Sequence, residues 1–141
     1  RQALIFTNNE GDSWSTSILS GAKTATLNGI TFGNNQFFSV GSDGKFIRST
    51  DNGSNFVDRD PGQAVSRHLY SIVVGNNTFV GVGYYTVIVS TDNGSNFIEK
   101  ETTLTFNDVT FGNGVFVAVG DDEKIYTSTD DGDSWTKVYG K

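Results

Sequence analysis

Residues 30–57 read ITFGNNQFFSVGSDGKFIRSTDNGSNFV, and the same pattern returns twice further along the chain. Residues 72–98 read IVVGNNTFVGVGYYTVIVSTDNGSNFI, and residues 109–136 read VTFGNGVFVAVGDDEKIYTSTDDGDSWT. A shorter stretch at residues 5–15, IFTNNEGDSWS, matches only the second half of this unit. The chain is therefore a half-copy followed by three whole copies, with a period of about 40 residues.

Each whole copy predicts four short strands. Apolar and polar residues alternate with a period of two, and glycine and asparagine interrupt the alternation at regular points. In the first whole copy the predicted strands are Leu27–Phe32, Gln36–Gly41, Lys45–Thr50 and Asn55–Asp58. The segment Gly33-Asn34-Asn35 would close the first hairpin, because Gly and Asn tolerate a positive φ. Four strands at this period are typical of a β-propeller blade.

The chain has 141 residues, enough for one domain with one core. Its apolar residues favour strands, with 14 Val, 8 Ile and 11 Phe against 5 Leu and 5 Ala. We therefore expect a single all-β domain, an incomplete β-propeller of about three and a half blades. The half-blade is expected at residues 1–20, and the four-stranded antiparallel blades are expected at 27–60, 69–101 and 106–141.

Charge and composition argue against several classes of function. The net charge is −6, from 10 basic and 16 acidic residues, so we expect neither nucleic-acid binding nor attraction to an anionic membrane surface. The chain has no Cys and one His, which excludes disulfides, thiolate chemistry and almost every structural zinc site. No apolar run approaches the roughly 20 residues of a membrane helix. We expect no metal and no other cofactor.

A second motif joins the third and fourth predicted strands of every copy. It has the pattern S-x-D-x-G-x-x-[WF], with a degenerate version at residues 7–14. Its members are Ser49, Asp51, Gly53 and Phe56; Ser90, Asp92, Gly94 and Phe97; Ser128, Asp130, Gly132 and Trp135; and, in the degenerate copy, Gly11 and Trp14. The Asp and Ser side chains can hydrogen-bond to the backbone of the turn, Gly supplies an unusual φ, and the aromatic ring can pack between sheets. We expect the motif to stabilise the hairpin rather than to bind calcium, since the aspartates at 130–133 lack the Glu and the spacing of a calcium-binding loop.

This motif resembles the Asp box, or BNR repeat, of sialidase-like β-propellers, and the resemblance covers essentially the whole chain. Propellers of that family bind ligands near the axis, on the face that carries the loops after the second and fourth strands of each blade. The resemblance therefore implies ligand-binding candidates in the corresponding loops here, with the Asp boxes at the opposite face. These candidates are Asp43, Lys45, Arg67, His68, Tyr84, Tyr85, Asp121, Asp122 and Lys124.

Each candidate also has a purely structural interpretation. Tyr84 and Tyr85 are adjacent, so in a strand only one packs inward, and the other either stacks on a ligand or covers a blade edge. The acidic cluster at 121–123 suits cations or glycan hydroxyls, although solvated turn charge is the commoner explanation. The pair Arg67 and His68 precedes a strand, and a lone His is more often a hydrogen-bonding residue than a catalyst.

An enzyme of this family would show features that the sequence does not show. Sialidases hold the substrate carboxylate with three arginines from separate blades and use a Tyr nucleophile with an acidic partner. The arginines of this chain are Arg1, Arg48, Arg59 and Arg67, and none recurs at a blade-equivalent inner position. Glucan-cleaving members use two carboxylates on facing blades. We therefore expect no catalysis by this chain alone and assign no catalytic residue.

Three and a half blades are too few for a ring, since closed propellers have about 4 to 8 blades. Apolar residues such as Phe32, Val73, Phe111 and Val119 would then be bare at the ends of the arc, and such patches attract a partner. We predict that a second copy, a second polypeptide or the rest of a longer chain completes the ring. An identical partner favours two-fold symmetry. Arg1 stands where an initiator Met would, which indicates a processed, excised or incomplete chain.

Two functions follow from these expectations. The leading one is a non-catalytic recognition or scaffold module that binds a glycan or a protein. The alternative is a fragment of an Asp-box glycoside hydrolase, sialidase-like or glucanase-like, whose active site needs the missing blades. The resemblance also implies an extracytoplasmic protein, whether secreted, periplasmic or at the cell surface. Asn52, Asn76 and Asn93 begin N-x-[ST] glycosylation patterns, which turn composition alone also produces.

Overall fold

The computed structural model describes residues 4–20, 25–58 and 67–141, which build four sheets. Blade 1 is the two-stranded pair β1 (Ile5–Phe6) and β2 (Ser15–Thr16). Blade 2 contains β4 (Leu27–Gly33), β5 (Gln36–Gly41), β6 (Phe46–Ser49) and β7 (Asn55–Asp58), with the 3-10 turn η1 (Ser42–Gly44) between β5 and β6. Blade 3 contains β8 (Leu69–Gly75), β9 (Thr78–Gly83), β10 (Thr86–Ser90) and β11 (Ile98–Glu101). Blade 4 contains β12 (Phe106–Gly112), β13 (Val115–Gly120), β14 (Ile125–Ser128) and β15 (Thr136–Tyr139).

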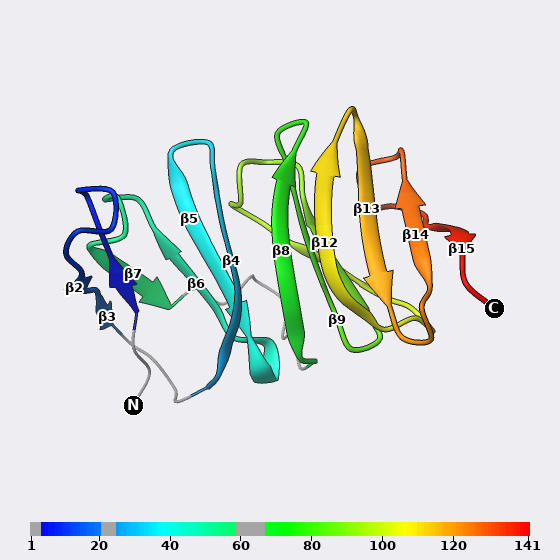
Figure 1. Ribbon diagram of the computed structural model, residues 1–141, viewed down its shortest axis with the longest axis horizontal. Coiled ribbons are helices and arrows are strands. Elements are labelled where there is room, and N and C mark those ends of the chain that lie inside the picture. The colour runs from blue at the N-terminus through cyan, green and yellow to red at the C-terminus, as the bar shows by residue number, and fades with distance from the viewer. Residues whose placement is uncertain (1–3, 21–24, 59–66) are drawn as a thin grey trace.

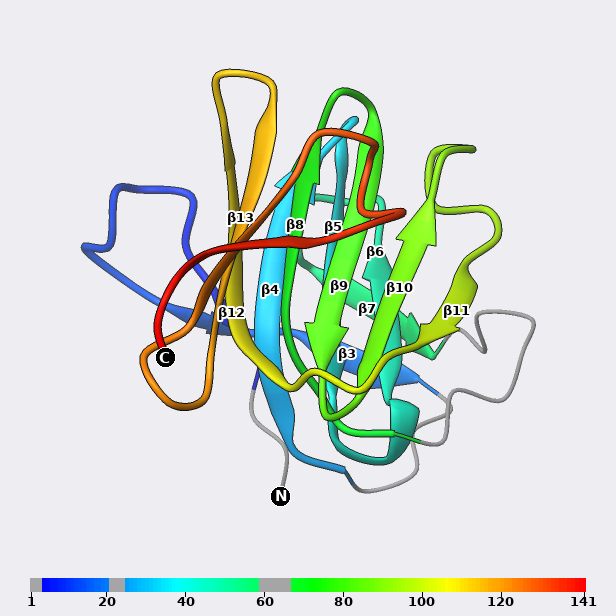
Figure 2. The same cartoon turned by 90° about the vertical axis from the view of Figure 1, so that its right-hand side faces the viewer.

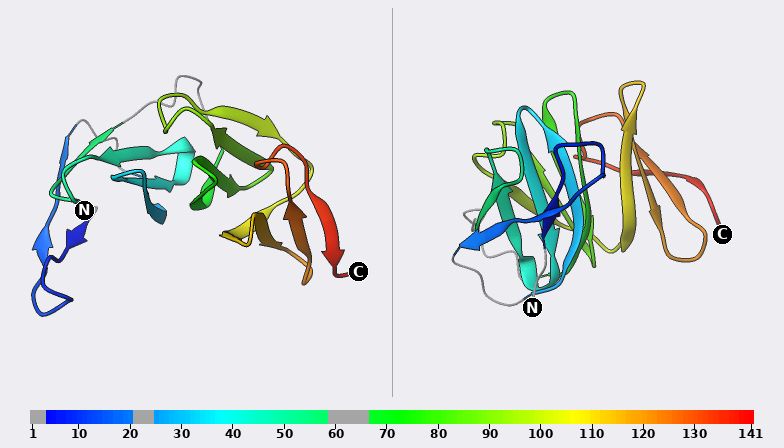
Figure 3. Two further views of the ribbon diagram at one scale, coloured as in Figure 1. Left: turned by 90° about the horizontal axis from the view of Figure 1, so that it is seen from above. Right: turned by 60° about the vertical axis from the view of Figure 1, so that its left-hand side comes forward.

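The blades stand side by side from the N-terminal to the C-terminal end of the molecule (Figure 1). Seen from above they form an open arc, with β4, β8 and β12 on the concave side and β7, β11 and β15 on the convex side (Figure 3). Within each whole blade the four strands pair antiparallel in sequence order. The chain is thus an all-β, incomplete β-propeller, as the sequence predicts. The predicted strands of blade 2 agree with the observed ones to within a residue at each end.

One strand departs from the expected organisation. The strand β3 (Ile18–Ser20) lies in the stretch assigned to the half-blade, yet it pairs in parallel with β7 as a fifth strand of blade 2. The outer edge of β7 would otherwise present unpaired backbone groups, which a passing segment can satisfy. The repeat pattern does not encode this pairing, because the repeat unit itself contains only four strands.

The core lies between the blades. One cluster joins blades 2 and 3 and contains Phe38, Val40, Phe46, Leu69, Ile72, Phe79, Ile88 and Phe97. A second joins blades 3 and 4 and contains Val80, Val82, Val87, Val89, Phe106, Val109, Phe116, Ala118 and Tyr126. Val73 and Phe111 pack against this second cluster. The expectation that these two residues lie on a bare face is wrong, because β8 and β12 meet at an internal junction of the arc.

Glycines let the inner strands of neighbouring blades approach closely. A Cβ at Gly33 would lie 2.3 Å from Cγ1 of Val74, and a Cβ at Gly75 would lie 2.1 Å from Cγ of Phe111. One side chain of the following blade therefore rests on a glycine of the preceding blade at each internal junction. Among the described residues, nothing lies within 4 Å of a Cβ at the equivalent glycine of blade 4, Gly112. The same part of the chain holds no helix long and apolar enough to span a membrane.

Candidate functional site

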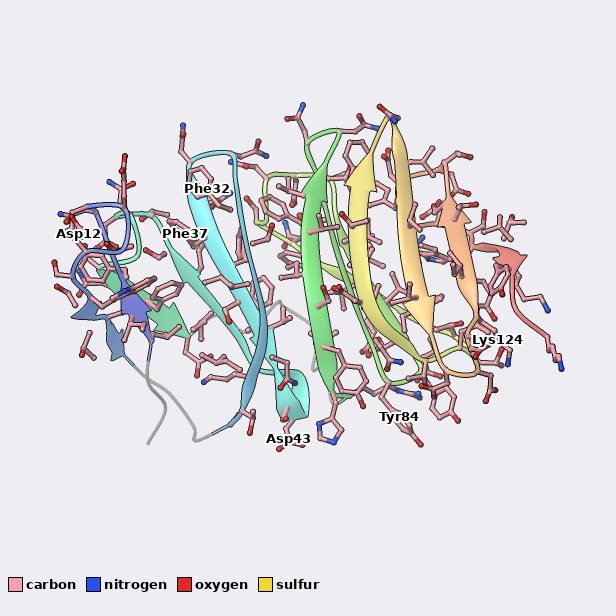
Figure 4. All side chains as sticks on the ribbon, viewed as in Figure 1. Asp12, Phe32, Phe37, Asp43, Tyr84 and Lys124 are labelled. Carbon is pink, nitrogen blue, oxygen red and sulfur yellow. The ribbon has the colours of Figure 1, made fainter. Side chains whose placement is uncertain are left out.

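Most of the predicted ligand-binding residues lie at one end of the blades, which we call the lower end from its position in Figure 1. The lower end carries the links between β5 and β6, between β9 and β10, and between β13 and β14. Figure 4 places Asp43, Tyr84 and Lys124, one from each link, at this end. The hairpins that join β4 to β5, β8 to β9 and β12 to β13 lie at the opposite, upper end (Figure 1).

His68 connects the lower links of blades 2 and 3 through hydrogen bonds. The backbone N–H of Asp43 donates to Nδ1 of His68 at 3.1 Å. The backbone N–H of Tyr84 donates to the carbonyl oxygen of His68 at 2.9 Å. His68 is therefore used to join two blades.

Arg67 connects the same two blades. Its carbonyl oxygen accepts from the N–H of Gly44 at 3.0 Å. Its guanidinium donates to the carbonyl oxygen of Tyr85 at 3.3 Å and to Oε1 of Glu101 at 2.9 Å. These two hydrogen bonds attach the guanidinium to blade 3. Residues 59–66 of the same predicted loop, including Arg59, lie outside the described residues, as does Arg1.

Tyr84 and Tyr85 do not point to opposite faces of a strand. They form the two-residue link between β9 and β10, and Tyr85 has a φ of 53°. Their ring centroids lie 4.3 Å apart, and both side chains are exposed. The alternation expected from the sequence is wrong here because it holds only within a strand. The turn instead presents two exposed rings in contact at the lower end, with an interplanar angle of 54°.

A pocket of about 180 Å³ opens at the lower end between blades 3 and 4. It is lined by Tyr85, Thr103, Leu104, Thr105, Asp121, Asp122, Lys124 and Tyr126. The pocket brings together four of the predicted residues, Tyr85, Asp121, Asp122 and Lys124. Asp43, Arg67, His68 and Tyr84 are not among its walls. We call this the blade 3–4 pocket.

The charged groups of the blade 3–4 pocket are paired with one another and with neighbouring polar groups. Lys124 Nζ donates to Oδ2 of Asp122 at 3.0 Å, and this hydrogen bond and the charge of Asp122 raise the pKa of Lys124. Asn107 Nδ2 donates to Oδ1 of Asp121 at 3.0 Å. Of the two tyrosines in the lining, Tyr126 is buried and Tyr85 is exposed. The lining of the pocket thus combines two tyrosines and one leucine with charged and hydroxyl-bearing side chains.

Lys45 is not part of the exposed lower surface. Its side chain is only 5% exposed, and Nζ donates to Oδ2 of Asp58 at 2.5 Å. A buried ammonium needs such a partner because removing it from water is costly. The structure therefore pairs Lys45 with an acid of its own blade, whereas the sequence predicts that Lys45 contacts a ligand.

The Asp-box-like turns share one hydrogen-bond pattern. In blade 3, Ser90 Oγ donates to Oδ1 of Asp92 at 2.8 Å and accepts from the N–H of Gly94 at 2.9 Å. Asp92 also accepts from the backbone N–H of Asn96 at 2.9 Å and from its side-chain amide at 2.7 Å. The same pattern recurs with Ser49, Asp51 and Asn55, with Ser128, Asp130 and Ser134, and with Thr7, Asn9 and Ser13.

These hydrogen bonds favour the ionised carboxylates. Those donated by the backbone and side chain of Asn96 lower the pKa of Asp92 to about 2. Ser134, through its side chain and then its backbone, lowers the pKa of Asp130 to about 2. The side-chain amide of Asn55 is the largest cause of the lowered pKa of Asp51. All of these donors belong to the same turn as the carboxylate they contact, so each acid closes its own hairpin.

The aromatic residue that ends each motif differs in burial along the chain. Phe56 and Phe97 are buried, and Trp135 packs partly buried against the second core cluster. Trp14, in the half-blade, is 58% exposed. Among the described residues, no group of three or more His, Asp or Glu side chains is placed to hold a metal ion.

Sequence reasoning missed two features near the candidate residues. Tyr126 lines the blade 3–4 pocket although it belongs to a strand, and only its place beside the link 121–124 could have indicated this. An open groove of about 460 Å³ also lies at the upper end between blades 2 and 3. It is lined by Asn34, Asn35, Asn77, Thr91, Asp92 and Asn93.

The three glycosylation candidates, Asn52, Asn76 and Asn93, are exposed in turns, and Asn93 accepts two hydrogen bonds from Gln36 Nε2.

Comparisons with known proteins support the architecture. No family model matches the chain, and no curated protein matches it. A structure of YCF48 bound to D1 peptide has a TM-score of 0.71 at 20% identity, over 81% of this chain and 41% of that one. YCF48 from Cyanidioschyzon merolae has a TM-score of 0.68 at 19% identity, over 81% of this chain and 37% of that one. A GH74 enzyme from Niastella koreensis has a TM-score of 0.66 at 19% identity, over 96% of this chain and 21% of that one.

These similarities extend over less than half the length of each solved chain. At such identities the similarity shows only the fold, a β-propeller. The activity of this chain has to be argued from its own residues.

Proposed function

We propose that this chain is a non-catalytic recognition module that binds a polypeptide segment, or a glycan, in the blade 3–4 pocket. The proposal depends chiefly on one observation, the convergence of Tyr85, Asp121, Asp122 and Lys124 on one pocket over the buried ring of Tyr126. Convergent polar groups fix the orientation of a ligand in a binding site, and here two tyrosines stand beside them. One propeller of the same fold was solved with a bound peptide, which supports a polypeptide as the first ligand to test.

The chemistry of the pocket favours a neutral or basic ligand. The only described cation of the wall, Lys124, is already paired with Asp122, whereas Asp121 accepts only an amide hydrogen bond from Asn107. An exposed carboxylate at a rim attracts a cationic group and repels an anionic one. A peptide with a Lys or Arg beside an apolar residue would place its charge at the rim and its apolar part on the tyrosines.

We further propose that the chain belongs with the Asp-box propellers and that additional blades complete its ring. The recurring Ser–Asp–Gly hydrogen bonds support the family assignment. The open arc supports the completion. An extracytoplasmic location follows only from that family assignment and is tested by fractionating cells that express the native protein.

A glycoside-hydrolase fragment is the second candidate, because the GH74 structure matches 96% of this chain. The described acids of the lower end give it little support. A general acid in a glycosidase sits where burial or a like charge keeps its proton. Asp122 instead is exposed and paired with Lys124, and Glu101 is exposed and paired with Arg67.

Binding of the native protein to peptide and glycan arrays tests the proposal. We expect Tyr85→Ala and Asp121→Asn each to reduce binding at least tenfold. The matched controls are Asp43→Asn, which removes a carboxylate at the lower end outside the pocket, and Trp14→Ala, which removes an exposed aromatic ring of blade 1. Equal loss in the controls, or no binding on either array, would overturn the proposal. Hydrolysis of aryl sialosides or glucans by the same preparation would establish the alternative.

A further inference from the structure

A second pocket lies beside the blade 3–4 pocket, on the outer strands of the same two blades. It has a volume of about 200 Å³ and is lined by residues at the end of β11 and in the Asp-box-like turn of blade 4. Its lining includes Val87, Leu104 and Trp135 together with the ion pair of Lys100 and Asp133. We call it the outer pocket.

Leu104 belongs to the lining of both pockets. It lies in the link from β11 to β12, which crosses the lower end from the outer to the inner strands (Figure 2). Thr102 fixes the path of this link, because its N–H donates to the Tyr85 carbonyl oxygen at 3.2 Å and its Oγ1 accepts from the N–H of Leu104 at 3.1 Å. The Leu104 side chain is partly buried and packs against the second core cluster. One anchored side chain therefore separates the two pockets.

The aromatic residues that line the two pockets contact the same buried ring. The ring centroid of Phe106 lies 5.3 Å from that of Tyr126, in the blade 3–4 pocket, and 5.1 Å from that of Trp135, in the outer pocket. Phe106 itself is fully buried. A single aromatic cluster therefore supports both pockets.

Neither pocket alone has the size of an ordinary ligand site. Ligand pockets generally have at least about 300 Å³. The blade 3–4 pocket has about 180 Å³ and the outer pocket about 200 Å³, so that only the two together exceed this size. The pair is therefore one elongated site that Leu104 divides into two halves.

The two halves differ in chemistry. Two carboxylates and one ammonium line the blade 3–4 pocket, at positions 121, 122 and 124. The outer pocket has apolar walls in Val87, Leu104 and Trp135, and its two acids and one lysine are each in an ion pair. Successive side chains of a polypeptide can differ in this way, whereas the units of a glycan all present hydroxyl groups. The two halves together therefore favour a polypeptide.

Trp135 distinguishes blade 4 from the other whole blades. The Asp-box-like motif ends in Phe56 in blade 2 and in Phe97 in blade 3. The indole Nε1 of Trp135 is buried and makes no hydrogen bond with the described residues. The hairpin therefore does not use the group by which Trp differs from Phe, and the wider ring instead extends the wall of the outer pocket.

We propose that the two pockets form one site for an extended polypeptide, with a Lys or Arg side chain at Asp121 and an apolar side chain two residues away against Trp135. Successive side chains of an extended chain point to opposite sides, so residues i and i+2 share a side. Because only the side chain of Leu104 separates the two pockets, such a pair enters both. This inference rests on the proposed function and adds to it the second pocket and the spacing of the ligand residues.

Capped peptides test the spacing on the unmodified chain. The reference is whichever of Lys-Ser-Leu and Leu-Ser-Lys binds more tightly. We expect it to bind at least about tenfold more tightly than its counterpart with Ala in place of Leu, and than a peptide in which Lys and Leu are adjacent, because a buried Leu side chain contributes about that much. Equal affinities would overturn the inference and leave the proposed function intact, whereas a lack of binding by every peptide would contradict both.

The fluorescence of Trp135 reports on the outer pocket itself. The chain has two Trp, so Trp14→Phe, at an exposed position of blade 1, leaves Trp135 as the only indole. In this variant the reference peptide should shift the emission of Trp135 to shorter wavelength, and its Ala counterpart should not, because only the Leu side chain excludes water from the ring. Binding of the reference peptide without this shift would contradict the inference. So would a shift caused by a neutral oligosaccharide such as cellotetraose and by none of the peptides.

Leu104→Ala tests the division of the site. It joins the two pockets, so the affinity for a peptide with Trp at the apolar position should rise at least fivefold relative to the affinity for the reference peptide. The matched control Ile98→Ala truncates an exposed apolar side chain outside both pockets and should leave this ratio unchanged. Leu104→Val makes the same test with a smaller loss of packing if Leu104→Ala does not fold. An unchanged ratio in a folded Leu104 variant would show that Leu104 does not divide the site.

Discussion

The ring of Phe111 lies directly over Gly75, so that a Cβ added to this glycine would be 2.1 Å from Cγ of the ring. Blades 3 and 4 therefore approach to backbone distance at their inner strands. The glycine is required by its neighbour, and the same requirement disappears at Gly112, where blade 4 has no described neighbour. A comparison of substitutions at these two equivalent glycines therefore distinguishes the effect of packing between blades from the effect of the strand itself.

Gly75→Ala should therefore destabilise the chain, and Gly112→Ala should not. Overpacking of this kind costs about 1–3 kcal/mol, whereas a substitution into open space changes stability by less than about 0.5 kcal/mol. Urea unfolding of both variants measures the difference. Equal effects would mean that Phe111 does not rest on Gly75.

The buried pair Lys45 and Asp58 gives a second prediction. Asp58→Ala leaves the ammonium of Lys45 without its carboxylate, at a site where the Lys side chain is 5% exposed. We expect a loss of about 2–3 kcal/mol, below the 3–5 kcal/mol of fully buried pairs because the Asp58 side chain keeps some contact with water. Urea unfolding of Asp58→Ala and of the double variant Lys45→Met/Asp58→Ala should show part of the loss recovered in the double variant.

Asp122→Ala is the matched control for that experiment. It breaks the pair with Lys124, which lies at the surface, and such exposed pairs contribute about 0–1 kcal/mol. A loss from Asp122→Ala as large as that from Asp58→Ala would contradict the assignment of Lys45 to the interior.

The turn carboxylates predict a pH dependence of stability. The pKa of Asp92 falls from 3.8 to about 2 on folding, so the folded chain binds fewer protons in this range. The stabilisation is therefore complete above about pH 4 and is lost as the pH falls toward 2. Asp92→Asn should lower the melting temperature at pH 7, and its difference from the unmodified chain should shrink as the pH approaches 2. Melting curves by circular dichroism between pH 2 and 7 measure this difference.

Asp12→Asn changes the net charge equally in the exposed turn of blade 1 and serves as the control. Its melting temperature should follow that of the unmodified chain at every pH. A constant difference between Asp92→Asn and the unmodified chain across the range would show that the carboxylate's charge does not fasten the turn.

The strands of this fold could be predicted because the turn residues that end them are adjacent to them in the sequence. Asn34 and Asn35 both have positive φ, as their sequence suggests, and the strands around them end where the period-two alternation ends. Pairings that depend on the path of the chain could not be predicted in the same way. The parallel contact of β3 with β7 follows from where the link from blade 1 passes, which no repeat unit encodes.

The candidate site was harder to predict because loop residues serve two purposes. Lys45 stands in a link like Lys124, yet one ammonium turns inward to Asp58 and the other remains at the lower end with Asp122. The spacing is the same, and the difference arises from an acid at position 58 on the neighbouring strand. Tyr85 likewise reaches the pocket because a turn replaces the strand that alternation would predict.

The last prediction concerns the contacts that attach the Arg67 side chain to blade 3 at the lower end. The guanidinium of Arg67 donates to the carbonyl oxygen of Tyr85 and to the carboxylate of Glu101. The backbone carbonyl oxygen of Arg67 accepts from the N–H of Gly44. Arg67→Ala should lower stability by about 0.5–1.5 kcal/mol, because it removes one hydrogen bond to a backbone oxygen and one exposed ion pair.

Glu101→Gln separates the two contributions, since it removes only the charge of the ion pair and should cost no more than about 0.5 kcal/mol. The double variant gives the coupling between Arg67 and Glu101 in a thermodynamic cycle measured by urea unfolding. Hydrogen exchange at the Thr102 amide, which donates to the Tyr85 carbonyl oxygen at 3.2 Å, reports on the link directly. Faster exchange there in Arg67→Ala than in Glu101→Gln would show that the guanidinium holds the Tyr85 turn. Equal exchange in the two variants would assign its role to the ion pair alone.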